Sequence, residues 1–81
     1  MKYELFKEVA LAADIPEHRL KKGDIATVVE YLPAPPNSEP GYALEVFNTL
    51  GETIDVLSVG ESEIEPLRPS EVWHARDMVM A

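Results

Sequence analysis

The chain lacks several features that would assign it to a familiar class of protein. Its 81 residues contain no cysteine, which excludes disulfides and cysteine-ligated metal sites. No apolar run approaches the ~18 residues of a membrane-spanning helix, so we expect no contact with a membrane. The charged N-terminus, Met1 to Glu8, has no apolar core of a signal peptide. These absences predict a cytoplasmic protein.

Catalytic chemistry also finds little support. His18 and His74 are the only histidines, and neither has the spacing to acidic residues that is typical of a metal site. No serine is accompanied by a recognisable base and orienting acid. We therefore predict no catalytic residue, no metal, no cofactor and no enzymatic activity. His18, between Glu17 and Arg19, is expected to be a solvated loop residue, and His74 is expected to be structural.

Basic residues are few and unevenly placed. Seven lysines and arginines face fifteen acidic residues, for a net charge of −8. Residues 1–32 carry a net charge of −1, and residues 33–81 carry −7. Such acidity repels a phosphate backbone, so direct nucleic-acid binding is unfavourable. A basic protein partner is favoured electrostatically, although a charge of this size can also serve solubility alone.

Turn-forming residues divide the chain into short segments of strand character. The segment from Asp14 to Glu30 carries Ile15-Pro16, then a Lys22-Gly23-Asp24 turn, then a β-branched run. This pattern predicts the entry into a small, highly curved β-barrel. Gly23 is expected at a positive φ. Strands are predicted at about residues 8–13, 24–32, 41–48 and 53–59, and Tyr42, Leu44 and Val46 are expected to share one face.

Two segments fall outside this simple pattern. The stretch 33–41 is rich in proline, which cannot donate to a strand ladder, and is predicted to be a stiff surface loop. The C-terminal extension, residues 70–81, is compatible with a strand, a short helix or a tail. We favour a strand or an extended tail packed on the barrel, since an exposed Trp73 with Met78 and Met80 would otherwise form an unexplained apolar patch.

Several motifs together resemble a family of short, uncharacterised bacterial proteins, a domain of unknown function. They are Val9-x-Leu11, Asp14-Ile-Pro-Glu17, Leu20-x-x-Gly-Asp24, Thr27-Val-Val-Glu30, Tyr42-x-Leu-Glu-Val-Phe47, Gly51-x-Thr53 and Leu67-Arg-Pro69. The resemblance implies one SH3-like, five-stranded all-β barrel over residues 1–81, with a C-terminal tail or added strand. The chain differs in its proline-rich loop and in having Ala26 where a glycine is expected.

The functional implication of this resemblance is narrow. Some members of the family look like small acidic partners encoded beside a larger, toxin-like protein. The chain is therefore expected to be a non-catalytic protein-binding module, acting as an antitoxin or immunity partner of a basic protein from the adjacent gene. A fold does not by itself determine a function. This expectation therefore has to be tested against the residues that could bind a partner.

Candidate partner-binding residues lie in the acidic second half. Glu61, Glu63 and Glu65 alternate with other residues, so an extended backbone would present three carboxylates on one side. Their alternative role is to protect an edge strand from aggregation. Trp73 and Arg76 are the candidates in the C-terminal extension.

Two other classes of function remain as alternatives. Arg19, Lys21 and Lys22 would contact phosphate if the barrel were RNA- or ribosome-associated, although three cations flanked by acids more often form a solvated turn. A self-associating structural module would form a homodimer through Trp73, Met78 and Met80.

Overall fold

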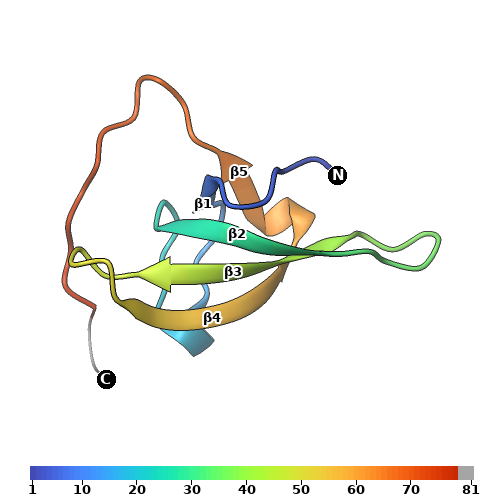
Figure 1. The fold of residues 1–81 in the computed structure, drawn as a ribbon, viewed down its shortest axis with the longest axis horizontal. Helices are drawn as coiled ribbons and strands as arrows, with labels where there is room; N and C mark the ends of the chain where they lie inside the picture. Colours follow the sequence, from blue (N-terminus) through green and yellow to red (C-terminus); the bar gives the residue numbers. More distant parts are fainter. Residues whose placement is uncertain (79–81) are drawn as a thin grey trace.

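A computed structural model describes residues 1–78 and has an all-β fold built from one antiparallel sheet. The strands are β1 (Glu8–Leu11), β2 (Ile25–Leu32), β3 (Gly41–Phe47), β4 (Thr53–Gly60) and β5 (Ile64–Pro66). The sheet order is β4-β3-β2-β1-β5, and Figure 1 shows the strands curving into a barrel-like shape. Two 3-10 helices, η1 (Pro16–His18) and η2 (Glu61–Glu63), complete the fold. The prediction of a small all-β barrel is confirmed.

Alternation along the strands places the core on the concave face of the sheet. Tyr42, Leu44 and Val46 of β3 are all buried on one face, as predicted. Leu57 and Val59 of β4 join them, whereas Ile54 and Val56 are 44% and 58% exposed. The core therefore uses only one face of β4, since side chains of period two point to opposite sides of a sheet.

The alternation of buried and less buried residues along β2 stops after Val28, and this change has a local cause. The register with β3 shifts between Val28 and Glu30, where β2 contains an irregularity of the β-bulge type. A bulge bends its strand and increases the local twist. Ala26, at the position where a glycine was expected, is buried and pairs with Val9 of β1. Gly23, in the turn before β2, has φ of +91° as predicted.

Several predicted boundaries require correction. β1 ends at Leu11, not at residue 13. The segment Glu61–Glu63 is a 3-10 helix and not an extended strand. From Leu67 to Met78 the chain contains no strand; it forms a tail that returns past the side of the barrel where β3 ends and β4 begins (Figure 1). Among the described residues, no helix has the length and apolarity needed to cross a membrane.

Backbone pairing and hydrogen bonds join the start of β3 to the end of β4 and to η2. Gly41 pairs with Gly60, and a Cβ on Gly41 would lie 2.8 Å from the carbonyl oxygen of Val59. The N–H of Glu61 donates to the carbonyl of Pro40 over 2.9 Å. The carboxylate of Glu39 accepts hydrogen bonds from the N–H and hydroxyl of Ser62. The last residues of the proline-rich loop are thus part of the barrel.

A buried tyrosine ties the N-terminus to the sheet. The hydroxyl of Tyr42, a fully buried residue, accepts hydrogen bonds from the N–H groups of Lys2 and Tyr3 over 3.0 and 3.1 Å. It donates to Glu61 Oε2 over 3.0 Å. The rings of Tyr3 and Tyr31 lie 5.5 and 5.4 Å from the ring of Tyr42, centroid to centroid. One side chain therefore joins the N-terminal segment, β3 and η2.

Replacing Tyr42 by phenylalanine tests this role. The substitution keeps the ring but removes the acceptor for two backbone N–H groups, so the free energy of unfolding should fall by about 1–3 kcal/mol. Urea unfolding followed by circular dichroism measures the change. Tyr31→Phe is the matched control, because the ring of Tyr31 contacts the same cluster, and it should cost less than about 0.5 kcal/mol. Equal losses in the two variants would contradict the role of the Tyr42 hydroxyl.

Candidate functional site

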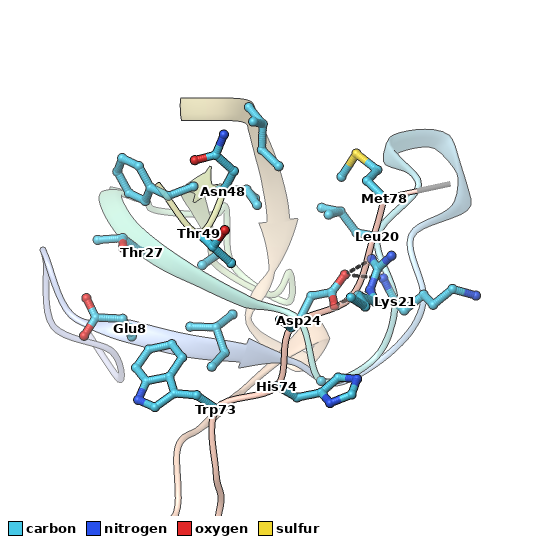
Figure 2. Close-up of a pocket in the computed structure, with 18 of the residues that line it drawn as sticks. Glu8, Leu20, Lys21, Asp24, Thr27, Asn48, Thr49, Trp73, His74 and Met78 are labelled. Atoms are coloured by element: carbon cyan, nitrogen blue, oxygen red, sulfur yellow. Dashed lines mark hydrogen bonds and ion pairs between the residues drawn. The ribbon is translucent and has the colours of Figure 1, made fainter. Parts of the chain in front are cut away.

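Within residues 1–78, a concavity lies between the C-terminal tail and the strands. It is a cleft of about 820 Å³. Figure 2 shows Glu8 of β1 and Thr27 of β2 on one side of this cleft, with Trp73 and His74 of the tail on the other. Apolar side chains supply much of the remaining lining, which includes Leu20, Ala26, Val46, Phe47, Ile54, Val72 and Met78. The barrel provides the floor of the cleft, and the tail provides one wall.

An ion pair between the tail and the turn before β2 holds this wall in place. Arg76 Nε donates to Asp24 Oδ1 over 2.9 Å, and Arg76 Nη2 donates to Asp24 Oδ2. Arg76 Nη2 also donates to the carbonyl of Arg19 over 3.2 Å. Met78 packs against the hydrophobic core just beyond this pair. A planar guanidinium that binds both carboxylate oxygens has a defined orientation, so it fixes the path of the tail.

The electrostatics of Asp24 reflect the same contact. Partial burial acts to raise the pKa of this carboxyl, but the hydrogen bond from Arg76 and that from the N–H of Lys21, together with the positive charges of both side chains, outweigh burial and lower the pKa. The pKa of Arg76 is raised above its ordinary value, chiefly by its hydrogen bond to Asp24. The pair therefore stays charged throughout the neutral range.

The two ends of the cleft differ in charge. Glu8 and Trp73 lie at one end, and Lys21 and Met78 lie at the other (Figure 2). In the described part of the chain, the carboxylate of Glu8 makes no hydrogen bond or ion pair, whereas the carboxylate of Asp24 is fully engaged by Arg76 and Lys21. The unpaired negative charge of the cleft is thus beside the indole.

The structure separates the three predicted acidic residues. Because Glu61–Glu63 is helical, these carboxylates do not form a row on one side of an extended strand, and this part of the prediction is wrong. Glu61 accepts from the Tyr42 hydroxyl, and Glu63 Oε1 accepts from the N–H of Gly60 over 2.7 Å. Glu65 alone lies in β5, where it pairs with Ala10 of β1. Two of the three carboxylates therefore hold the structure of their own chain, Glu61 through the Tyr42 hydroxyl and Glu63 through the local backbone.

Other predicted residues are brought together by the fold. Trp73, Arg76, Lys21 and Lys22 all line the cleft. The N–H groups of Lys21 and Lys22 donate to Asp24 and Asp14, so two carboxylates lie within this basic cluster. An RNA contact there gains no support from this arrangement and stays a prediction.

The predicted dimer seam is only partly available. Trp73 is exposed, but Met78 packs on the core of its own chain. Met80 lies outside the described residues. Homodimer formation through this segment stays a prediction, with Trp73 as its remaining described member.

His18 differs from its predicted environment. It is half-buried, and its Nδ1 lies 2.6 Å from Asp55 Oδ2. The second oxygen of Asp55 accepts from the N–H of Val56 over 2.8 Å. His18 is therefore part of a contact between η1 and β4 and not a freely solvated loop residue. The two partners are 37 positions apart, and no local pattern in the sequence indicates their contact.

Sequence reasoning also missed Glu8 and Asp24 as parts of the site. Nothing in the sequence distinguishes Glu8 from the other acidic residues, because only the register Glu8↔Thr27 and the returning tail place it in the cleft. Asp24 was read as a turn residue, which it is, since it accepts from the N–H of Lys21. No local sequence pattern indicates that Asp24 pairs with Arg76, which is 52 positions away. Within residues 1–78, no group of three or more histidine, aspartate and glutamate side chains is placed to hold a metal ion.

Removing the guanidinium should release the tail. In Arg76→Ala the rotational anisotropy of Trp73, the only tryptophan, should fall because the segment that carries it is no longer anchored. The free energy of unfolding should fall by about 1 kcal/mol, the upper end for an ion pair near the surface. Arg68→Ala is the control: among residues 1–78 the Arg68 side chain pairs only with nearby Glu71, over 3.5 Å, and its loss should change neither quantity measurably. Unchanged anisotropy in Arg76→Ala would contradict the anchoring role.

Acid should release the tail as well. Because the pKa of Asp24 is lower in the folded protein than the ordinary value of 3.8, the ion pair stabilises the fold above that value and loses its contribution as the pH falls through the lowered pKa. Trp73 anisotropy recorded from pH 6 downward should stay level to about pH 4 and then decrease. Asp24→Asn should show low anisotropy throughout. A transition centred near neutral pH would be inconsistent with this ion pair as the anchor.

Comparison with known proteins identifies one family. Residues 5–66 match the domain of unknown function DUF4926. The match includes all five strands and ends at the last residue of β5, so Glu8 and Asp24 lie inside it, whereas Trp73 and Arg76 lie beyond it. Comparison with curated proteins and with solved structures finds no similar protein. Since the match covers most of the chain, the protein belongs to the DUF4926 family of domains of unknown function.

Proposed function

We propose that this protein is a non-catalytic binding module for a basic protein, and that it acts as the antitoxin or immunity partner of a toxin-like protein encoded beside it. The observation that carries the proposal is charge. All fifteen acidic and seven basic residues lie within residues 1–78, and no charged side chain there is buried. The full net charge of −8 is therefore presented at the surface of a small barrel.

A surface charge of one sign mainly affects the rate at which partners associate with the protein and which partners it binds. A complementary partner is steered toward the acidic surface, and like-charged partners, including nucleic acids, are repelled. The cleft adds a place for specific contact, since a largely apolar concavity with a few polar groups is the usual form of a binding site. The proposal includes an SH3-like barrel and an antitoxin role, both of which are implied by the resemblance of the sequence to its family.

The test is complex formation with the product of the neighbouring gene. Co-expression should give a stable complex, and co-expression should also relieve any growth arrest caused by the partner alone. Affinity should fall as salt rises, because exposed charges are screened beyond about 8 Å at physiological ionic strength. Failure to form a complex, or a complex indifferent to salt, would refute the electrostatic proposal.

Charge reversal refines this test. Glu65→Lys with Asp77→Lys changes two acids of the second half whose carboxylates make no hydrogen bond or ion pair among the described residues, so the fold should be preserved. Glu61 and Glu63 are unsuitable because both bind the local backbone or Tyr42. The lysine pair should weaken the complex about tenfold or more, and the neutral pair Glu65→Gln with Asp77→Asn should weaken it by less. Equal affinity of all three proteins would place the interface elsewhere.

A further inference from the structure

The cleft holds an exposed tryptophan beside an unpaired carboxylate. Trp73 is 77% exposed although it lines a concavity of the fold. Glu8 of β1 is at the same end of the cleft, on the side that the barrel provides (Figure 2). Large aromatic side chains of soluble domains usually contribute to a core or an interface. Trp73 is mostly outside the core of its own chain.

The tail that carries the indole is nevertheless held on the barrel by the residues that follow Trp73. Arg76 binds both oxygens of Asp24, and Met78 inserts against the core. The tail is thus anchored three and five residues after Trp73. A side chain that is held before its ligand arrives loses less entropy on binding. The tail therefore presents Trp73 as a preformed wall.

We propose that this end of the cleft receives a lysine or arginine side chain of the basic partner; the inference rests on the proposed function and names its contact site. The indole face attracts a cation, and the Glu8 carboxylate supplies the opposite charge. Phe47 and Ile54, which line the same cleft, cover the methylene stem of a long basic side chain. Lys21 lies at the far end of the cleft (Figure 2), so the end with Glu8 is the one that favours a cation.

The chemistry of the cleft argues against other occupants. Lys21 and Lys22 also line the cleft, but at the end beside Trp73 an acidic or phosphorylated segment would meet the unpaired Glu8 carboxylate, and the net charge of −8 would oppose its approach. A purely apolar segment would bury the Glu8 carboxylate without a partner, at a cost in free energy. A basic side chain with an apolar stem satisfies both the aromatic wall and the carboxylate.

The probe is an N-acetylated, C-amidated octalysine peptide carrying a fluorescent label, titrated with the full chain at about 0.15 M ionic strength. The fluorescence anisotropy of the label gives the affinity. Quenching of Trp73, recorded with unlabelled peptide, reports whether the contact is at the cleft. We expect binding by the wild type with a change in Trp73 emission. Glu8→Gln and Trp73→Ala should each weaken binding about 3- to 10-fold, within the range of a cation–aromatic contact or a close ion pair.

Glu30→Gln is the matched control. Glu30 is an exposed carboxylate on β2 that does not line the cleft, and its loss changes the net charge by the same amount as the loss of Glu8. It should weaken binding less than about twofold, because distant charges are screened. Circular dichroism and urea unfolding of each variant confirm that the fold is retained.

The outcomes separate the two proposals. If octalysine binds, but Glu8→Gln and Trp73→Ala behave like Glu30→Gln, the acidic surface attracts cations and the cleft inference is overturned while the proposed function stands. If the wild type shows no binding even at low salt, attraction of a basic partner fails, and the cleft inference fails with it. Weakened binding in both cleft variants, with Glu30→Gln unaffected, supports the assigned contact.

Discussion

The hydroxyl of Tyr42 is the interaction on which the rest of the barrel depends. Tyr42 is the second residue of β3 and is fully buried, and its hydroxyl accepts from two backbone N–H groups of the N-terminal segment while donating to Glu61. In a small domain the core alone contributes little net stability. A satisfied polar group at its centre therefore has a large influence, because it sets where three separate segments meet.

The candidate site depends on a second contact, between Arg76 and Asp24. The DUF4926 match ends at the last residue of β5, so the barrel supplies Glu8 and Asp24, while the indole and the guanidinium come from the tail beyond it. The barrel and the tail each contribute an incomplete surface, and the ion pair joins them into a cleft. The cleft of this chain accordingly requires residues from the tail, which lies beyond the matched region.

Local sequence patterns predicted the strands, but they did not predict the side-chain pairs between residues that are distant in the sequence. Residues 41–48 alternate cleanly, and β3 occupies 41–47. The acidic segment 61–65 also alternates, yet Glu63 bonds the N–H of Gly60 and closes a helical turn, which alternation alone cannot reveal. The His18–Asp55 and Asp24–Arg76 pairs join residues 37 and 52 positions apart. The curvature of the sheet and the path of the tail bring these partners together. Neither can be predicted from a short stretch of sequence.

The hydrogen bonds at the start of β3 divide the proline-rich segment 33–41 into two parts, one that is bonded to the barrel and one that is not. Residues 39–41 bond η2 or approach β4 too closely to accept a Cβ at Gly41. The β2–β3 hairpin is closed by the pairing of Leu32 with Gly41, so residues 33–38 project from a junction that is already complete. Loop tips of this kind tolerate exchange and insertion. The barrel thus offers an attachment point for a foreign peptide, at the opposite end of β3 from the residues that reach the cleft.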